Sequence, residues 1–101
     1  MIQSVLVRIT RRAAEQITQA ADWWEVNRPL APGAVYDEFD EALNILRSQP
    51  EIGASAFSTR VRNVRRIHLS RISYFLYYRV QPGRIDILAL WHSSRGAGPR
   101  L

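Results

Sequence analysis

The spacing of apolar residues changes abruptly along this chain, and that change sets its fold. Between residues 11 and 49 apolar residues recur every three or four positions, as on one face of an α-helix. From residue 61 to residue 92 they alternate or run together, as in β-strands. The sequence therefore predicts an α+β fold in a single domain over residues 1–101, with helices packed on one face of a small, mostly antiparallel sheet.

Two amphipathic helices are expected in the first half of the chain. Thr10 is a suitable N-cap for the first helix, and Pro29 ends it because the residue before a proline avoids helical geometry. Residues 30–33 make a short connection, and the second helix ends before Pro50. Helices joined by so short a loop must lie antiparallel, so residues 11–49 are predicted to form a helical hairpin.

The remaining segments complete the order β-α-α-β-β-β. Strands are expected at residues 5–10, 61–69, 72–80 and 85–92, an irregular loop at 51–59 and a mobile tail at 93–101. The last strand is an almost unbroken apolar run, which is typical of a strand covered on both faces. Pro82 and Gly83 precede it in a segment that fits a type II turn.

Charge is divided unevenly between the two halves. Residues 60–101 carry nine arginines against one acidic residue, a formal charge of +8, whereas residues 1–59 carry five arginines against eight acidic residues, a charge of −3. Arginine pairs bidentately with phosphate and carboxylate and stacks on aromatic rings. A basic, aromatic-rich sheet therefore predicts an acidic partner, either nucleic acid or an acidic protein segment.

Cysteine and histidine usage excludes several kinds of site. The chain has no cysteine, which excludes disulfides, thiolate metal sites and a cysteine nucleophile. His68 and His92 are too few for a histidine-built metal centre, so we expect no metal and no cofactor. The short apolar run near the N-terminus ends at Arg8, unlike a signal peptide or a membrane span. We therefore expect a cytoplasmic protein that does not enter the membrane.

Taken together, these segments resemble the RelE/ParE superfamily of bacterial type II toxins over nearly the whole chain. No single segment is specific; the resemblance rests on their order and spacing. The segments are the pair Trp23-Trp24, the end of the second helix at Leu43-Asn44-Ile45-Leu46, the basic strand Val64-Arg65-Arg66-Ile67, the run Tyr77-Tyr78-Arg79-Val80, and His92 followed by Arg95. The resemblance implies a toxin that a cognate antitoxin holds silent.

The two branches of that superfamily differ in chemistry. The RelE-like branch implies ribosome-dependent mRNA cleavage by basic residues on the sheet and a C-terminal tyrosine, whereas the ParE-like branch implies poisoning of DNA gyrase. Phe75 stands where the nuclease branch tends to place an arginine, and residues 93–101 contain no aromatic residue. We therefore expect a ParE-like gyrase inhibitor that arrests growth, with a RelE-like mRNA endonuclease as the alternative.

The resemblance and the charge pattern together nominate three sets of residues. The arginines expected to bind the target are Arg65, Arg66, Arg79 and Arg95. The residues expected to act if the chain cleaves RNA are Arg66, His68, His92 and Arg95. The residues expected to bind an acidic antitoxin, partly disordered until bound, are Trp23, Arg62 and Arg71.

Several of these residues also have a purely structural interpretation. His92 can fix the turn into the tail, Arg79 can stack beside aromatic rings, and His68 can be a solvated residue on an outward face. A plain nucleic-acid-binding module is a third functional hypothesis. It would need exposed stacking rings on the outer face of the sheet, for which Phe75 and Tyr77 are the candidates.

Overall fold

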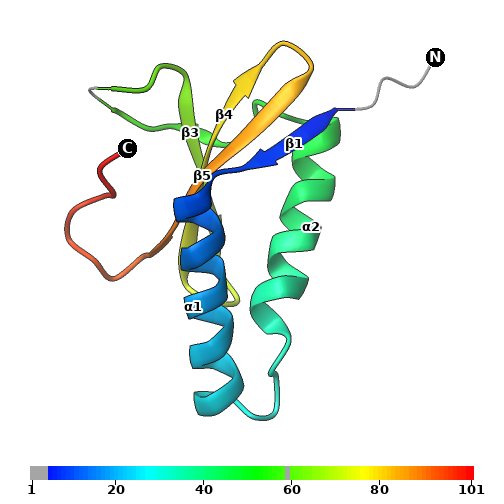
Figure 1. The fold of residues 1–101 in the computed structure, drawn as a ribbon, viewed down its shortest axis with the longest axis vertical. Coiled ribbons are helices and arrows are strands. Elements are labelled where there is room, and N and C mark those ends of the chain that lie inside the picture. The colour runs from blue at the N-terminus through cyan, green and yellow to red at the C-terminus, as the bar shows by residue number, and fades with distance from the viewer. Residues whose placement is uncertain (1–4, 59) are drawn as a thin grey trace.

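The computed structural model describes residues 5–58 and 60–101, and its elements follow the predicted order with one addition (Figure 1). The elements are β1 (Leu6–Ile9), α1 (Arg11–Asn27), α2 (Ala34–Ser48), β2 (Ala54–Ser55), β3 (Val64–Leu69), β4 (Tyr74–Gln81) and β5 (Arg84–His92). The strands form one sheet in the order β1-β5-β4-β3-β2, with β1 parallel to β5 and the other neighbours antiparallel. The predicted α+β fold is confirmed.

The main differences from the predicted strands concern β2, β3 and β4. The expected loop at 51–59 contains the two-residue strand β2, which pairs with β3. Strand β3 begins at Val64 rather than at residue 61 because Asn63 has a φ of 60°, which interrupts extended backbone. In the same way a φ of 62° at Ser73 makes β4 begin at Tyr74 rather than at residue 72.

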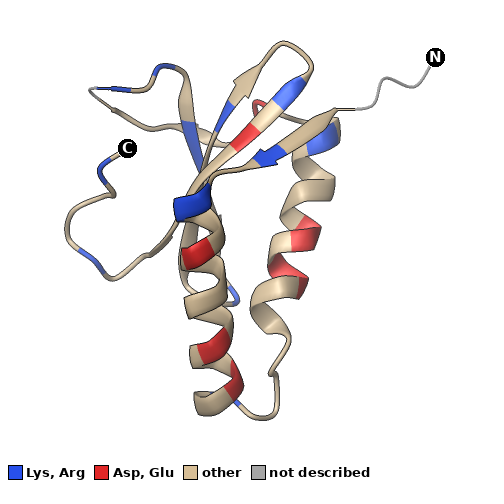
Figure 2. Ribbon diagram, in the orientation of Figure 1, with Lys and Arg blue, Asp and Glu red and all other residues tan. Residues whose placement is uncertain are grey.

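The helical hairpin covers one face of the sheet, called here the helix face (Figure 1). The Thr10 hydroxyl accepts a hydrogen bond from the Ala13 N–H at 3.1 Å, which confirms the predicted N-cap. The buried stripe of α1 consists of Ala13, Ile17, Ala20 and Ala21, and that of α2 of Ala34, Val35, Phe39, Ala42, Leu43 and Leu46. Most of the acidic residues lie on the two helices, whereas the arginines are spread over the strands, the helix ends and the loops (Figure 2).

Strand β5 is buried on both faces, as its apolar run predicted. Ile85, Ile87 and Leu90 belong to the core beneath the helices. Ala89 belongs to a second, smaller cluster on the opposite face, called here the outer face, together with Tyr77. A β-bulge at the Tyr77–Tyr78 step shifts the pairing of β4 with β5 by one residue.

The tail at 93–101 contacts the outer face. The Trp91 indole N–H donates a hydrogen bond to the Ala97 carbonyl at 2.8 Å, and the Arg12 side chain donates to the carbonyl of Arg100. Leu101 packs against the outer cluster. The mobility expected of this segment stays a prediction, but the tail contributes apolar cover that its polar composition did not indicate.

One acidic side chain, Asp86, is buried in the sheet with 2% of its surface exposed. Arg84 Nε lies 2.8 Å from its Oδ1 atom, and Arg79 Nε and the Gln81 amide lie 3.2 and 2.8 Å from Oδ2. Burial by itself would raise the pKa of Asp86, but these three donors together hold that pKa below its ordinary value. The carboxylate therefore stays charged and ties the β4–β5 turn together.

We expect Asp86→Asn to lower the free energy of unfolding by about 1–3 kcal/mol at pH 7, because hydrogen bonds to a charged group are weakened. The native pKa lies below the unfolded value of about 4, so this stabilisation is complete above about pH 4 and disappears as the pH falls through the native pKa. Urea unfolding of both proteins from pH 7 to pH 2.5 checks this. A difference in unfolding free energy between wild type and Asp86→Asn that stays constant over that pH range would contradict this prediction.

Candidate functional site

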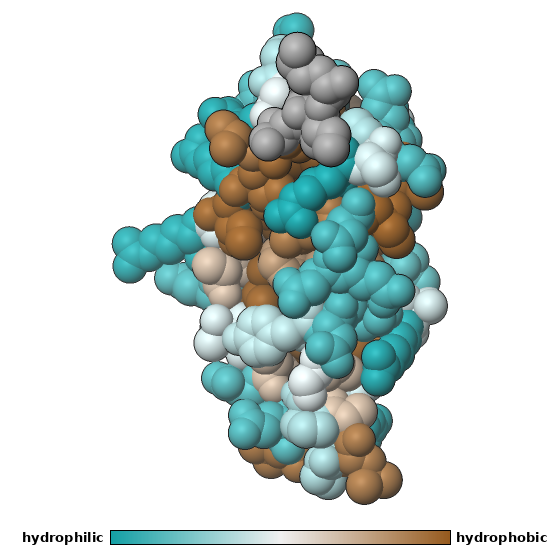
Figure 3. Space-filling view, turned by 90° about the vertical axis from the view of Figure 1, so that its right-hand side faces the viewer, coloured by the Kyte–Doolittle hydropathy of each residue, from teal (hydrophilic) through white to brown (hydrophobic). Residues whose placement is uncertain are grey.

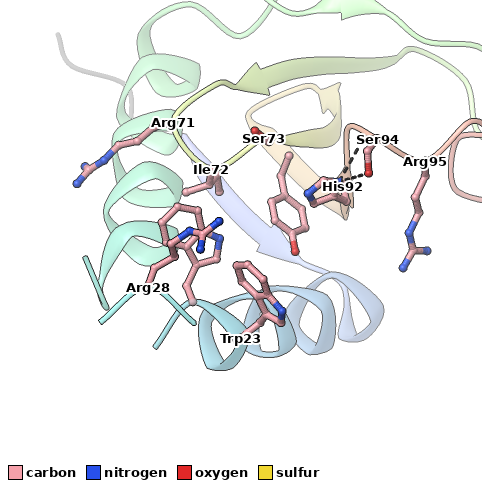
Figure 4. Close-up of a pocket in the computed structure, with 10 residues that line it drawn as sticks. Trp23, Arg28, Arg71, Ile72, Ser73, His92, Ser94 and Arg95 are labelled. Atoms are coloured by element: carbon pink, nitrogen blue, oxygen red, sulfur yellow. Dashed lines mark hydrogen bonds between the residues drawn. The ribbon is translucent and has the colours of Figure 1, made fainter. Parts of the chain in front are cut away.

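A pocket of about 620 Å³ opens where the end of α1 meets the β3–β4 turn and the end of β5 (Figure 4). Its aromatic wall consists of Trp23, Trp24 and Tyr74. The two indoles meet edge to face, with ring centroids 6.2 Å apart and planes at 69°. Trp24 packs against the core, whereas Trp23 keeps 48% of its surface exposed at the rim. The pocket therefore presents an accessible aromatic ring to solvent.

Three arginines border the same pocket. Arg28, just after α1, places its guanidinium carbon 5.4 Å from the ring centroid of Trp23, within the range of a cation–π contact. Arg71 lies in the β3–β4 turn and is exposed. Arg95 stacks over Trp91 at 4.2 Å and is also exposed. Three positive charges thus gather around aromatic surface at one end of the hairpin.

His92 is held in a defined orientation at the pocket wall (Figure 4). Its Nδ1 atom accepts a hydrogen bond from the Ser94 N–H at 3.1 Å and lies 2.6 Å from the Ser94 hydroxyl. Because Nδ1 accepts, the proton of the neutral ring resides on Nε2. The ring also packs edge-on against Tyr74, with centroids 5.0 Å apart. This geometry supports the interpretation that His92 fixes the turn into the tail.

The Tyr74 hydroxyl is a second polar group of the pocket. Burial raises the pKa of Tyr74, and the positive charge of Arg95 partly opposes that rise. The phenol is therefore protonated at neutral pH and available as a hydrogen-bond donor.

A second group of candidate residues lies on the outer face. The Arg66 guanidinium stacks over Phe75 at 4.1 Å and donates a hydrogen bond to the Tyr77 hydroxyl at 3.2 Å. The His68 ring also contacts Phe75, with centroids 4.9 Å apart. This cluster of Arg66, His68, Phe75 and Tyr77 combines one cation, one imidazole and two aromatic rings.

The four residues expected to cleave RNA do not share a face. His68 pairs in register with Phe75, and His92 pairs with Tyr74. Neighbouring residues of a strand point to opposite faces, so His68 lies on the outer face and His92 on the helix face. Arg66 accompanies His68 on the outer face, whereas Arg95 lines the pocket with His92 and also stacks over Trp91.

The arginines expected to bind the target occupy different surroundings. Arg65 donates hydrogen bonds to the carbonyls of Glu51 and Gly53 at 3.1 and 2.7 Å, which anchors the segment before β2. Arg79 is paired with Asp86. Of the four, Arg95 is the most exposed, while the others are partly buried.

The pocket brings together residues nominated for different roles and adds two that were missed. Trp23 and Arg71 were expected to bind antitoxin, and His92 and Arg95 were candidates for the target site; all four line the pocket, and Arg62 does not. Sequence reasoning missed Arg28 because it stands in the segment that ends α1. It missed the role of Tyr74 because a strand aromatic is usually core.

Within residues 5–58 and 60–101 no group of three or more histidine, aspartate or glutamate side chains is placed to hold a metal ion. No helix of the described chain is long and apolar enough to cross a membrane.

Comparisons with known proteins agree with the fold. Residues 7–96 match the family described as the ParE toxin of the type II toxin–antitoxin system parDE. A solved structure titled "Chromosomal ParDE TA system from P. aeruginosa" superposes with a TM-score of 0.70 at 24% sequence identity, covering 90% of this chain and 98% of that chain. A comparison with curated proteins finds no match.

We expect the neutral His92 ring to be protonated at Nε2, because Nδ1 accepts from Ser94. Long-range ¹H–¹⁵N correlation of the imidazole nitrogens at pH 8.5 distinguishes the two tautomers. The solvent-exposed His68, for which no such acceptor bond is found among residues 5–58 and 60–101, serves as the internal comparison. A proton on Nδ1 of His92 would contradict the turn geometry.

Proposed function

The chain belongs to the family of ParE toxins of type II toxin–antitoxin systems, and on that premise we propose that it arrests growth by binding DNA gyrase and that a cognate antitoxin neutralises it. The observation that carries the gyrase proposal is the division of the candidate cleavage residues between two faces of the sheet. A nuclease needs its acid, its base and its cations around one scissile phosphate. A toxin that acts by binding does not need these groups on one face.

The contacts of the arginines support the same proposal. Arg65 and Arg79 are engaged with backbone carbonyls and with Asp86, so they are poorly placed to follow a developing phosphorane charge. Arg95 is exposed at the rim of the pocket and can reach an anionic partner. We therefore assign Arg95 as the principal target contact among the four candidates.

The alternative, a RelE-like ribosome-dependent mRNA endonuclease, retains one supporting observation. Arg66 and His68 lie together against Phe75 on the outer face. That pair could supply one cation and one proton-transfer group. The ring of Phe75 stands where a further cation would be needed, which leaves the alternative weaker.

We expect His68→Gln and His92→Gln each to leave growth arrest intact, because glutamine keeps hydrogen-bonding capacity and only the titration of the ring is lost. Loss of a true general acid or base would lower the rate of RNA cleavage by about 10²–10⁴-fold.

Arg95→Ala should abolish growth arrest when the variant is expressed at the same level as the wild type. Arg47→Ala, which replaces an exposed arginine of α2, is the matched control.

Assays with the same proteins in purified form identify whether the target is gyrase or ribosome-bound mRNA. We expect stabilised gyrase–DNA cleavage complexes with wild type and with both histidine variants, and intact mRNA on translating ribosomes. Cleavage of ribosome-bound mRNA that either histidine substitution abolishes would overturn the gyrase proposal and favour the endonuclease.

We further propose that the antitoxin covers the hairpin and the β1 edge. Apolar side chains are exposed along this surface: Leu6 at 68%, Trp23 at 48%, Val26 at 79%, Tyr36 at 49% and Ile45 at 40%. Figure 3, which shows the side of the molecule that lies to the right in Figure 1, displays apolar surface in its upper half. Exposed apolar surface of this kind marks a protein–protein interface.

Arg62, just before β3, and Arg71, in the β3–β4 turn, are exposed and would attract an acidic segment. We expect the association rate with the antitoxin to fall between 50 mM and 500 mM NaCl, because charge steering is screened beyond roughly 10 Å at 0.1 M salt. Stopped-flow mixing measures this rate, and Arg62→Ala with Arg71→Ala should flatten the salt dependence. A rate independent of salt in the wild type would count against charge steering.

A further inference from the structure

The pocket at the end of α1 is lined by hydrogen-bond donors and aromatic rings, and none of the described residues that line it is acidic. Its donors include the guanidinium groups of Arg28, Arg71 and Arg95. His92 adds an Nε2–H, because its Nδ1 is occupied by Ser94. A site with this excess of donors fits an anionic ligand. Its volume of about 620 Å³ falls within the usual range for small-molecule sites.

The aromatic and basic parts of the pocket lie side by side. Trp23 is half exposed at the rim, with Arg28 on one side of it and Arg95 on the other (Figure 4). A ligand that fills both parts must join a flat ring to an anion within a short distance. A nucleotide has this construction, since its base stacks on aromatic faces and its phosphate pairs with arginine.

We propose that this pocket binds one nucleotide, with the base against Trp23 and the phosphate at Arg95. The Nε2–H of His92 adds a hydrogen-bond donor to the pocket wall, and Arg71 adds positive potential at the rim.

An acidic peptide fits the observations less well. Its carboxylates are spread along a chain, so it would favour an extended groove with arginines at intervals. Here the cations surround one compact aromatic wall instead. The nucleotide proposal does not depend on gyrase as the target, and its test uses the purified chain alone. Failure of the nucleotide proposal therefore leaves the gyrase proposal untouched, and the reverse also holds.

The test follows the indole N–H signals of the three tryptophans by ¹H–¹⁵N NMR, assigned with single Trp→Phe variants. The probes are 5′-dAMP, deoxyadenosine, deoxyribose 5-phosphate and inorganic phosphate. We expect 5′-dAMP to shift the Trp23 signal and to bind at least about tenfold more tightly than deoxyadenosine or deoxyribose 5-phosphate. A single-stranded dA hexamer shows whether the pocket takes a free nucleotide or one nucleotide of a strand. Tighter binding of the hexamer than of 5′-dAMP indicates a nucleotide within a strand, and equal binding indicates a free nucleotide.

Two substitutions assign the contacts. Trp23→Ala should weaken 5′-dAMP binding by about 5- to 150-fold, the usual loss of one stacking contact. Arg95→Ala should weaken it by about tenfold or more, and Arg95→Lys should restore part of the loss because charge returns without the planar fork. Arg11→Ala is the matched control, since its side chain is 94% exposed at the opposite end of α1. Circular dichroism verifies that each variant is folded.

Three results would overturn the proposal. In the first, inorganic phosphate binds as tightly as 5′-dAMP, which means an unspecific anion site. In the second, Arg11→Ala weakens binding as much as Arg95→Ala, which means attraction by net charge alone. In the third, a hexaglutamate peptide shifts the Trp23 signal and 5′-dAMP does not, which assigns the pocket to an acidic protein segment.

Discussion

The burial of β5 on both faces is the constraint on which the rest of this structure depends. An apolar strand of nine residues must be covered above and below, and its backbone must be paired on both sides. The helices cover the face that carries Ile85 and Ile87, and residues of β3, β4 and the tail cover the face that carries Ala89. Strand β4 pairs with β5 along its whole length, whereas β1 pairs with it only from Arg84 to Ile87.

The short β1 explains where the pocket forms. Beyond Ile87 the free edge of β5 lies against α1, where the Gln16 side chain accepts a hydrogen bond from the Leu90 N–H at 2.9 Å. The helix thus takes the place of a neighbouring strand, and its far end reaches the last residues of β5. That arrangement brings Trp23 to His92 and Arg95 although some 70 residues separate them in sequence. Strand alternation then puts His68, which pairs with Phe75, on the other side of the sheet.

Much of the fold could be predicted because it rests on local signals. The helical stripes, the Thr10 cap and the Pro82–Gly83 turn are encoded by neighbouring residues, and Gly83 has the positive φ of 68° that the turn requires. The departures from extended backbone at Asn63 and Ser73 could not be predicted, since many residues of those types sit in ordinary strands.

The candidate site was less accessible to sequence reasoning because its members come from three distant segments. The resemblance nominated His92 and Arg95, and charge nominated Arg71, but nothing local indicates that they meet. Arg79 had been nominated as a target contact, and only the structure shows that it faces the buried Asp86. Long-range pairing thus decides which arginines stabilise the fold and which stay exposed.

Native-state hydrogen exchange of the backbone amides tests the central position of β5 most directly. We expect the hydrogen-bonded amides from Ile85 to Leu90 to be among the slowest in the protein, with opening free energies equal to that of global unfolding, because all of these residues except Leu88 are buried. Those of the tail should exchange by local opening. Rapid exchange in β5 while the helices stay protected would contradict the view that this strand organises the sheet and the pocket.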